Sequence, residues 1–125
     1  MTRWLLAAVT ATSLGCGYES GPASLSGEWR ATINALGIAS LTMTITESSN
    51  TLTATGQWQP MGETGTRTLS ANGLRFESGL NMVFTFQTAT GPAIFTTQGQ
   101  TENEDSFYLL FPVGDDPTRV IFTRR

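Results

Sequence analysis

The side chains in this chain that could do chemistry are few, and what is missing excludes most catalytic mechanisms. The seven basic residues are all arginines, and the chain has ten acidic residues, one cysteine and no histidine or lysine. A Ser-His pair and an imidazole metal site both need histidine, and a Schiff base needs lysine. Carboxylates and tyrosines are the acid–base groups that remain. We therefore expect no enzyme activity.

Two groups of carboxylates are dense enough to consider as a metal site. Glu102, Glu104 and Asp105 form one group, and Asp115 and Asp116 form the other. Neither has the alternate ligand positions and the closing bidentate glutamate of an EF-hand loop. A weak calcium site shared by two turns is conceivable, but solvated turn residues that keep the domain soluble are the favoured interpretation. We predict no metal and no cofactor.

The remaining reactive side chain is that of Cys16, which follows an export-type leader. Arg3 supplies a positive charge, residues 4–9 form an apolar core, and residues 10–15 are small or apolar. A secretory signal has this organisation. The apolar run is too short to cross a bilayer as a helix, which takes about 20 residues. We predict that residues 1–15 are a signal peptide.

The stretch Ser13-Leu14-Gly15-Cys16 resembles the lipobox of bacterial lipoproteins, although Ser13 stands where a larger aliphatic residue is usual. The resemblance implies that Cys16 becomes the diacylated N-terminus and anchors the chain to a membrane. Because Cys16 is the only cysteine, it has no internal disulfide partner. The alternative is an ordinary secretory signal beside an unpaired cysteine. Gly17 is not the aspartate that commonly retains lipoproteins in an inner membrane, so the resemblance favours an outer membrane where one exists.

The charge of residues 16–125 limits the partners that the exported chain can have. Six arginines face ten acidic residues, a formal net charge of −4, and no basic cluster is present. Nucleic acid is a poor candidate partner, because phosphate contacts depend on clustered basic residues. Residues 16–24 are rich in Gly and Ser and predict a flexible, lipidated tether. Residues 25–125 are long enough for one compact domain.

This domain shows the alternation of apolar and polar residues that is typical of strands. The clearest signal is a hairpin of residues 39–46 and 51–58 around a polar turn. An Asn72-Gly73 pair predicts a further turn. In all we expect eight strands, over residues 29–34, 39–46, 51–58, 66–71, 82–87, 93–100, 107–111 and 120–124. With no helical pattern among them, they predict an all-β fold, a single eight-stranded antiparallel up-and-down β-barrel, with a two-sheet β-sandwich as the alternative.

The segment Gly27-Glu28-Trp29, taken with Arg124 on the last strand, resembles the calycin group of barrels, the lipocalins and avidins. The resemblance implies that Trp29 closes one end of the barrel and that Arg124 packs across it. A guanidinium over an indole face gains cation–π energy. Ala31 stands where avidins have an asparagine, and Trp58 where they have a tyrosine. The resemblance therefore does not extend to biotin binding.

Large apolar side chains are predicted to point into the barrel, where they either line a ligand pocket or form the core. The candidates are Trp29, Met43, Trp58, Phe84 and Phe95. Eight strands enclose a space just wide enough to be filled by side chains or to hold one small ligand. The number of large residues favours a filled core.

The sequence thus predicts an exported, membrane-anchored lipoprotein of the bacterial cell envelope. Its most favoured role is an interaction or inhibitor-type module that binds an envelope protein through loops and outer surface, where Tyr108, Leu110 and Ile121 should point outward. The alternative is a lipocalin-like binder of a small apolar ligand. An open cavity in the barrel would favour the second role, and a filled interior the first.

Overall fold

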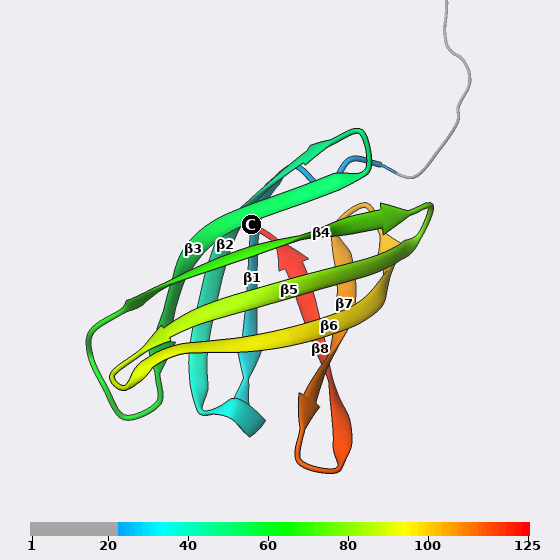
Figure 1. Cartoon of the computed structure of the whole chain (residues 1–125). Coiled ribbons are helices and arrows are strands. Elements are labelled where there is room, and N and C mark those ends of the chain that lie inside the picture. Colours follow the sequence, from blue (N-terminus) through cyan, green and yellow to red (C-terminus); the bar gives the residue numbers. More distant parts are fainter. Residues whose placement is uncertain (1–22) are drawn as a thin grey trace, which may run out of the picture.

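The computed structural model describes residues 23–125, which form a closed barrel of eight antiparallel strands (Figure 1). The strands follow one another around the barrel in chain order, and the last one returns to pair with the first. They are β1 (Gly27–Ile33), β2 (Ile38–Ser48), β3 (Thr51–Pro60), β4 (Arg67–Phe76), β5 (Gly79–Thr88), β6 (Gly91–Asn103), β7 (Ser106–Val113) and β8 (Asp116–Arg124).

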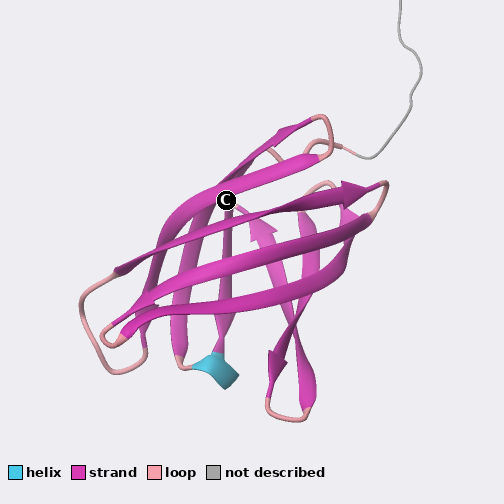
Figure 2. Ribbon diagram, in the orientation of Figure 1, coloured by secondary structure: helices cyan, strands magenta, loops and turns pink. Residues whose placement is uncertain are grey.

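The predicted all-β fold and up-and-down barrel are confirmed, and the two-sheet sandwich is excluded because the sheet closes on itself. One short 3₁₀ helix, η1 (Asn34–Leu36), joins β1 to β2 (Figure 2). Within residues 23–125, no helix has the length and hydrophobicity needed to cross a membrane. The predicted signal peptide and the predicted lipid attachment at Cys16 lie outside the described residues.

The hairpin predicted from the clearest alternation is β2 and β3. Its two strands pair continuously from Ser40↔Gln59 to Ser48↔Thr51. Ser49 and Asn50 make the connection, and both have left-handed backbones with φ of 51° and 68°. Two consecutive residues with positive φ match the right-handed twist of the flanking strands, which is why such a turn suits a tight hairpin.

The predicted turn at Asn72-Gly73 is wrong. β4 continues through both residues to Phe76, and the chain reverses at Glu77, whose φ is 60°. Gly73 instead allows the backbones of β4 and β5 to lie close together, because a Cβ at this position would collide with the carbonyl oxygen of Asn81 in β5. Glycine inside a strand often marks such a contact between backbones. β4 is therefore longer than predicted, and Arg75 belongs to it.

Alternating positions of the strands fill the barrel with apolar side chains. In β2 the buried residues Leu41, Met43 and Ile45 alternate with threonines, and in β5 the buried residues Met82, Phe84 and Phe86 alternate with a less buried valine and threonine. This period of two is the signature of a sheet with one face in the core and one in water. Both barrel ends are formed by turns, and the first described residues lie across the end that carries the β2–β3 turn (Figure 1).

Candidate functional site

The residues predicted to line a pocket or core all belong to the barrel interior. Trp29, Met43, Trp58 and Phe84 are buried, and Phe95 is half-buried and packs against the same core. They do not surround an empty space. Instead the four aromatic residues among them take part in a continuous cluster of aromatic rings.

Eight aromatic residues form this cluster, which we call the aromatic core. Neighbouring ring centroids lie 4.7 to 6.2 Å apart, within the range of favourable aromatic pairs. One route runs from Trp58 through Phe86, Phe84, Phe122 and Phe107 to Trp29. Phe95 and Phe111 form a side branch between Phe86 and Phe84. Rings at these spacings leave no room along this route for a ligand of drug size, so the core is filled by the protein's own side chains.

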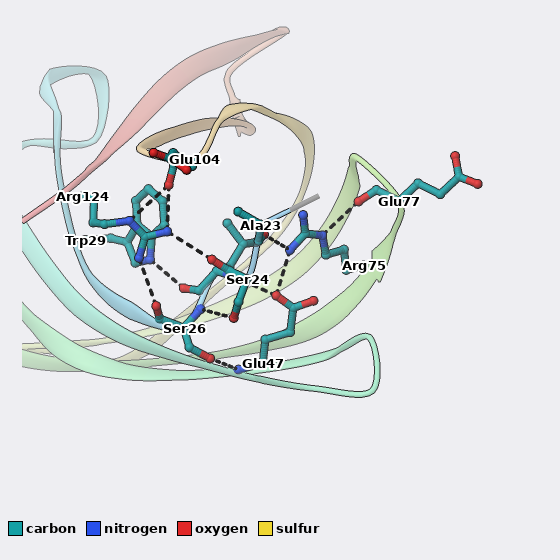
Figure 3. A network of polar contacts seen from close by, with 10 residues as sticks. Ala23, Ser24, Ser26, Trp29, Glu47, Arg75, Glu77, Glu104 and Arg124 are labelled. Atoms are coloured by element: carbon teal, nitrogen blue, oxygen red, sulfur yellow. Dashed lines mark hydrogen bonds and ion pairs between the residues drawn. The ribbon is translucent and has the colours of Figure 1, made fainter. Parts of the chain in front are cut away.

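At one end of the barrel, the chain segment 23–26 is fastened across the opening by two arginines. Figure 3 shows Arg124 and Arg75 on either side of this segment. We call the segment and the side chains that hold it the N-terminal clamp. It comprises residues 23–26 with Trp29, Glu47, Arg75 and Arg124.

Arg124 holds the segment from the side of the last strand. Its Nη1 donates to the carbonyl of Ser26 at 3.0 Å and its Nη2 to that of Ser24 at 3.1 Å. Nη2 and Nε also donate to the carbonyl of Glu104 in the β6–β7 turn, at 2.7 and 3.1 Å. The guanidinium carbon lies 4.4 Å from the centroid of the Trp29 ring, a cation–π arrangement. The structure thus brings Trp29 and Arg124 together at the end of the barrel.

Leu25 closes the opening beneath this segment. Its side chain is 2 % exposed and belongs to the core, and its carbonyl accepts a hydrogen bond of 2.8 Å from the indole Nε1 of Trp29. The indole thereby contributes its ring to the aromatic core and its polar atom to the clamp, the usual way in which a buried tryptophan is satisfied.

Arg75 holds the segment from the opposite side. Its side chain is 4 % exposed, and Nη1 donates to Glu47 Oε1 at 2.8 Å and to the carbonyl of Ala23 at 2.9 Å. Nε donates to the carbonyl of Glu77 at 2.9 Å. Glu47 Oε1 also accepts the backbone N–H of Leu25 at 2.8 Å. One partly buried ion pair therefore ties together β2, β4 and the N-terminal segment.

Sequence analysis did not identify Arg75 as a functional residue. Arg75 falls on the inward face only when β4 is extended past Gly73. Alternate residues of a strand point to the same side, so Arg75 then points inward with Leu69, Ala71 and Gly73. Its Nη2 is buried and has no hydrogen-bond partner among residues 23–125. The predicted boundary between tether and domain falls after residue 24, whereas the carbonyls of Ala23 and Ser24 already accept hydrogen bonds from the clamp.

The predicted acidic groups lie in and beside turns. Glu102 pairs with Arg119 at 2.7 Å, and Asp105 lies 3.4 Å from the guanidinium of Arg124. Asp115 and Asp116 occupy the exposed β7–β8 connection. Within residues 23–125, no three His, Cys, Asp or Glu side chains are arranged to hold a metal ion.

The residues predicted to face outward do so to different degrees. Ile121 is 51 % exposed and pairs across β7 and β8 with Tyr108, which is half-buried. Arg119 covers the Tyr108 ring, with its guanidinium carbon 3.9 Å from the ring centroid. Leu110 lines two shallow hollows on the outer wall, of about 280 and 360 Å³.

The architecture agrees with the calycin resemblance at the level of the fold. Eight antiparallel strands closed in chain order, with an arginine of the last strand over a tryptophan of the first, are what that resemblance implies. No protein family, curated protein or solved structure matches the chain.

Proposed function

We propose that the protein is an exported lipoprotein, held to a bacterial membrane through a lipid on Cys16, and that it binds a partner in the cell envelope through the outer wall of its barrel. The aromatic core is the observation that carries this proposal. Because eight rings occupy the interior at spacings of 4.7 to 6.2 Å, recognition falls to the outside of the barrel.

The N-terminal clamp supports the anchoring part of the proposal. A lipid on Cys16 would connect to the barrel at Ala23, where Arg75 and Arg124 fasten the chain. Seven residue steps of extended chain span at most about 25 Å. The end of the barrel with the β2–β3, β4–β5 and β6–β7 turns then faces the membrane, and the outer wall and the opposite end remain accessible to a partner.

The competing role is that of a lipocalin-like carrier with a small apolar ligand inside the barrel. Such a ligand would have to displace rings of the aromatic core. Removing one phenylalanine from a packed core costs about 3 to 5 kcal/mol. Because ligand binding would have to offset this loss of stability, the barrel interior is poorly suited to reversible transport.

Lipid attachment is tested in bacteria that express the full chain and are fed a clickable palmitate analogue. We expect label on the wild-type protein and its recovery with membranes. Cys16→Ser, which differs from it by one atom, should remain unlabelled. An unlabelled wild-type protein, or equal labelling of the two, would refute the lipoprotein assignment.

The location of the binding surface is tested by titrating the purified protein with a fluorescent fatty acid while following tryptophan emission. We expect no saturable quenching, because Trp29 and Trp58 are packed against phenylalanine rings. Saturable quenching at one ligand per barrel would overturn the outer-wall assignment and favour the carrier.

A further inference from the structure

The barrel wall is closed least completely between its first and last strands. The β1–β8 ladder contains two residue pairs, Trp29↔Arg124 and Arg30↔Thr123. On its other side β8 pairs with β7 without interruption from Asp116 to Thr123. Among residues 23–125, residues 116–122 of β8 therefore have no strand partner on the β1 side. We call this opening the seam.

An unpaired strand edge carries backbone N–H and C=O groups that can hydrogen-bond another extended chain. Seven residues of β8 span about 24 Å at the rise of a β-strand. That length is sufficient for a peptide strand to pair along it, the mode of recognition known as β-augmentation. The backbone of the seam can thus bind an extended segment, but backbone hydrogen bonds do not select a particular sequence.

Specificity for the partner's sequence must come from the side chains around the seam. A cleft of about 730 Å³ lies there, formed by residues of β1, β2 and β8. Its lining includes the exposed arginines Arg30, Arg119 and Arg125, which we call the rim arginines, and the exposed apolar residue Ile121. Leu41 and Val120 also line the cleft, but they are at most 3 % exposed and belong to the core. None of the residues that line the cleft is acidic. The cleft therefore combines basic and apolar side chains in a protein that is acidic overall.

The rim arginines differ in how firmly they are held. Arg30 and Arg125 form no ion pair within residues 23–125. Arg119 pairs with Glu102 and stacks on Tyr108, which fixes its guanidinium beside the seam while leaving it exposed. A guanidinium carries five donors, so a single exposed ion pair leaves most of them available to a carboxylate of a partner.

We infer that the seam binds an extended segment of a partner protein in which acidic side chains alternate with apolar ones. In a strand added to β8, alternate side chains point to opposite faces. One set, which we expect to be apolar, then points inward on the side of Val120, and the other, which we expect to be acidic, points outward on the side of Arg119. The inference rests on the proposed role as an interaction module, to which it adds a location and the chemistry of the partner.

A second copy of the same chain fits the seam less well. Antiparallel pairing of two β8 edges would bring the exposed Arg119 of each copy to the same interface with Arg30 and Arg125 nearby. Like charges that face each other across a strand pair are destabilising. Charge complementarity therefore selects an acidic segment from a different protein.

The test uses a capped, fluorescein-labelled heptapeptide, Glu-Val-Glu-Val-Glu-Val-Glu, whose length matches residues 116–122. Fluorescence anisotropy with the purified protein should show saturable binding that weakens as salt is raised. The double variant R30A/R119A should lose at least tenfold in affinity. Arg67→Ala, which removes a partly exposed, ion-paired arginine outside the cleft, is the matched control and should leave affinity unchanged.

A second arm asks whether the peptide pairs as a strand. Methylating backbone nitrogens at alternate positions removes donors from one edge of the peptide at a time. In one register the methylated peptide should bind at least tenfold more weakly, and in the other it should bind as before. Amide chemical shifts of residues 116 and 118–122 should change most on binding; Pro117 has no amide proton.

Several results would overturn the inference. Equal binding of a peptide with lysine in place of glutamate would remove the role of the arginines. Equal effects of the two methylation registers would show an ionic contact without strand pairing. A stable dimer that forms without peptide, seen by analytical ultracentrifugation, and that slows hydrogen exchange along β8 would assign the seam to a second copy. The peptide-binding results do not depend on lipid labelling at Cys16. A failure of the seam proposal is therefore distinguishable from a failure of the anchoring proposal.

Discussion

The arginines of the N-terminal clamp and those of the seam lie on the same small barrel in opposite surroundings. Arg75 is 4 % exposed, and Arg124 donates to three backbone carbonyls of its own chain. Arg30 and Arg125, by contrast, are exposed and form no ion pair within residues 23–125. A guanidinium whose donors are taken by its own backbone holds the fold together, whereas one with free donors can recognise a partner.

The largest effect expected from this contrast is at Arg75. Arg75→Ala leaves Glu47 without its cation, and the free energy of unfolding should fall by about 3 kcal/mol, the lower end of the cost of breaking a buried pair, because the Glu47 side chain is 15 % exposed. Urea denaturation should show this loss in the free energy of unfolding. Arg67→Ala, which breaks an exposed pair with Glu63, should lose at most about 0.5 kcal/mol. Similar losses in the two variants would remove the distinction between clamp and surface.

A smaller loss is expected at Arg124, which is partly exposed. Arg124→Ala removes charge-assisted bonds to the carbonyls of Ser24, Ser26 and Glu104 and the contact with Trp29, and we expect about 2 kcal/mol less stability. Arg124→Lys keeps the charge but not the planar fork, so it should recover part of this loss. Tryptophan emission provides a local readout, and an unchanged spectrum together with unchanged stability would argue against the clamp.

Backbone amides along the seam should exchange with solvent faster than those in the rest of the barrel wall. Amides of residues 116–122 that point away from β7 lack a strand partner, so we expect hydrogen exchange at least about tenfold faster than in β5, which corresponds to about 1.4 kcal/mol. The amide of Arg125, which donates to the carbonyl of Glu28 at 2.9 Å, should be protected. Uniform protection across β8 and β5 would mean that the seam is closed in solution.

The smallest effect on stability is expected from the seam arginines themselves. Arg30→Ala should change the free energy of unfolding by less than about 0.5 kcal/mol, because the side chain is exposed and has no ion-pair partner within residues 23–125. Thermal denaturation is sufficient to measure this. A loss comparable to that of Arg124→Ala would show that Arg30 is structural, and the contrast between the two sets of arginines would fail.

Local pattern was enough to predict the fold and much of the interior. Alternation along β2 and β3 identified Leu41, Met43 and Trp58 as buried, because a period of two and a polar turn are visible within twenty residues. The placement of Trp29 beside Arg124 agreed with a resemblance rather than with any local signal. The first prediction concerns features that single strands and their turn already contain, whereas the second concerns a contact between the first strand and the last.

The clamp and the seam could not be predicted in this way, because they depend on how distant strands end. The burial of Arg75 requires β4 to pass through Asn72-Gly73, and that pair is among the strongest local signals for a turn. The seam depends on the two-pair ladder between β1 and β8, whose residues are about 90 positions apart. The alternation of residues within either strand does not indicate how many residue pairs the two strands form with each other.

The bond between Arg124 and the carbonyl of Ser24 joins residues that are 100 positions apart, and this separation sets the order of folding. The first described residues cannot be fastened before β8 has been synthesised and has reached them. Every other strand pair of the barrel joins strands that are consecutive in the chain, so the closure of β8 on β1 carries the largest loop-closure cost. Under the export proposed above, the interval before β8 reaches Ser24 is the time in which a translocation machinery can thread the unfolded chain.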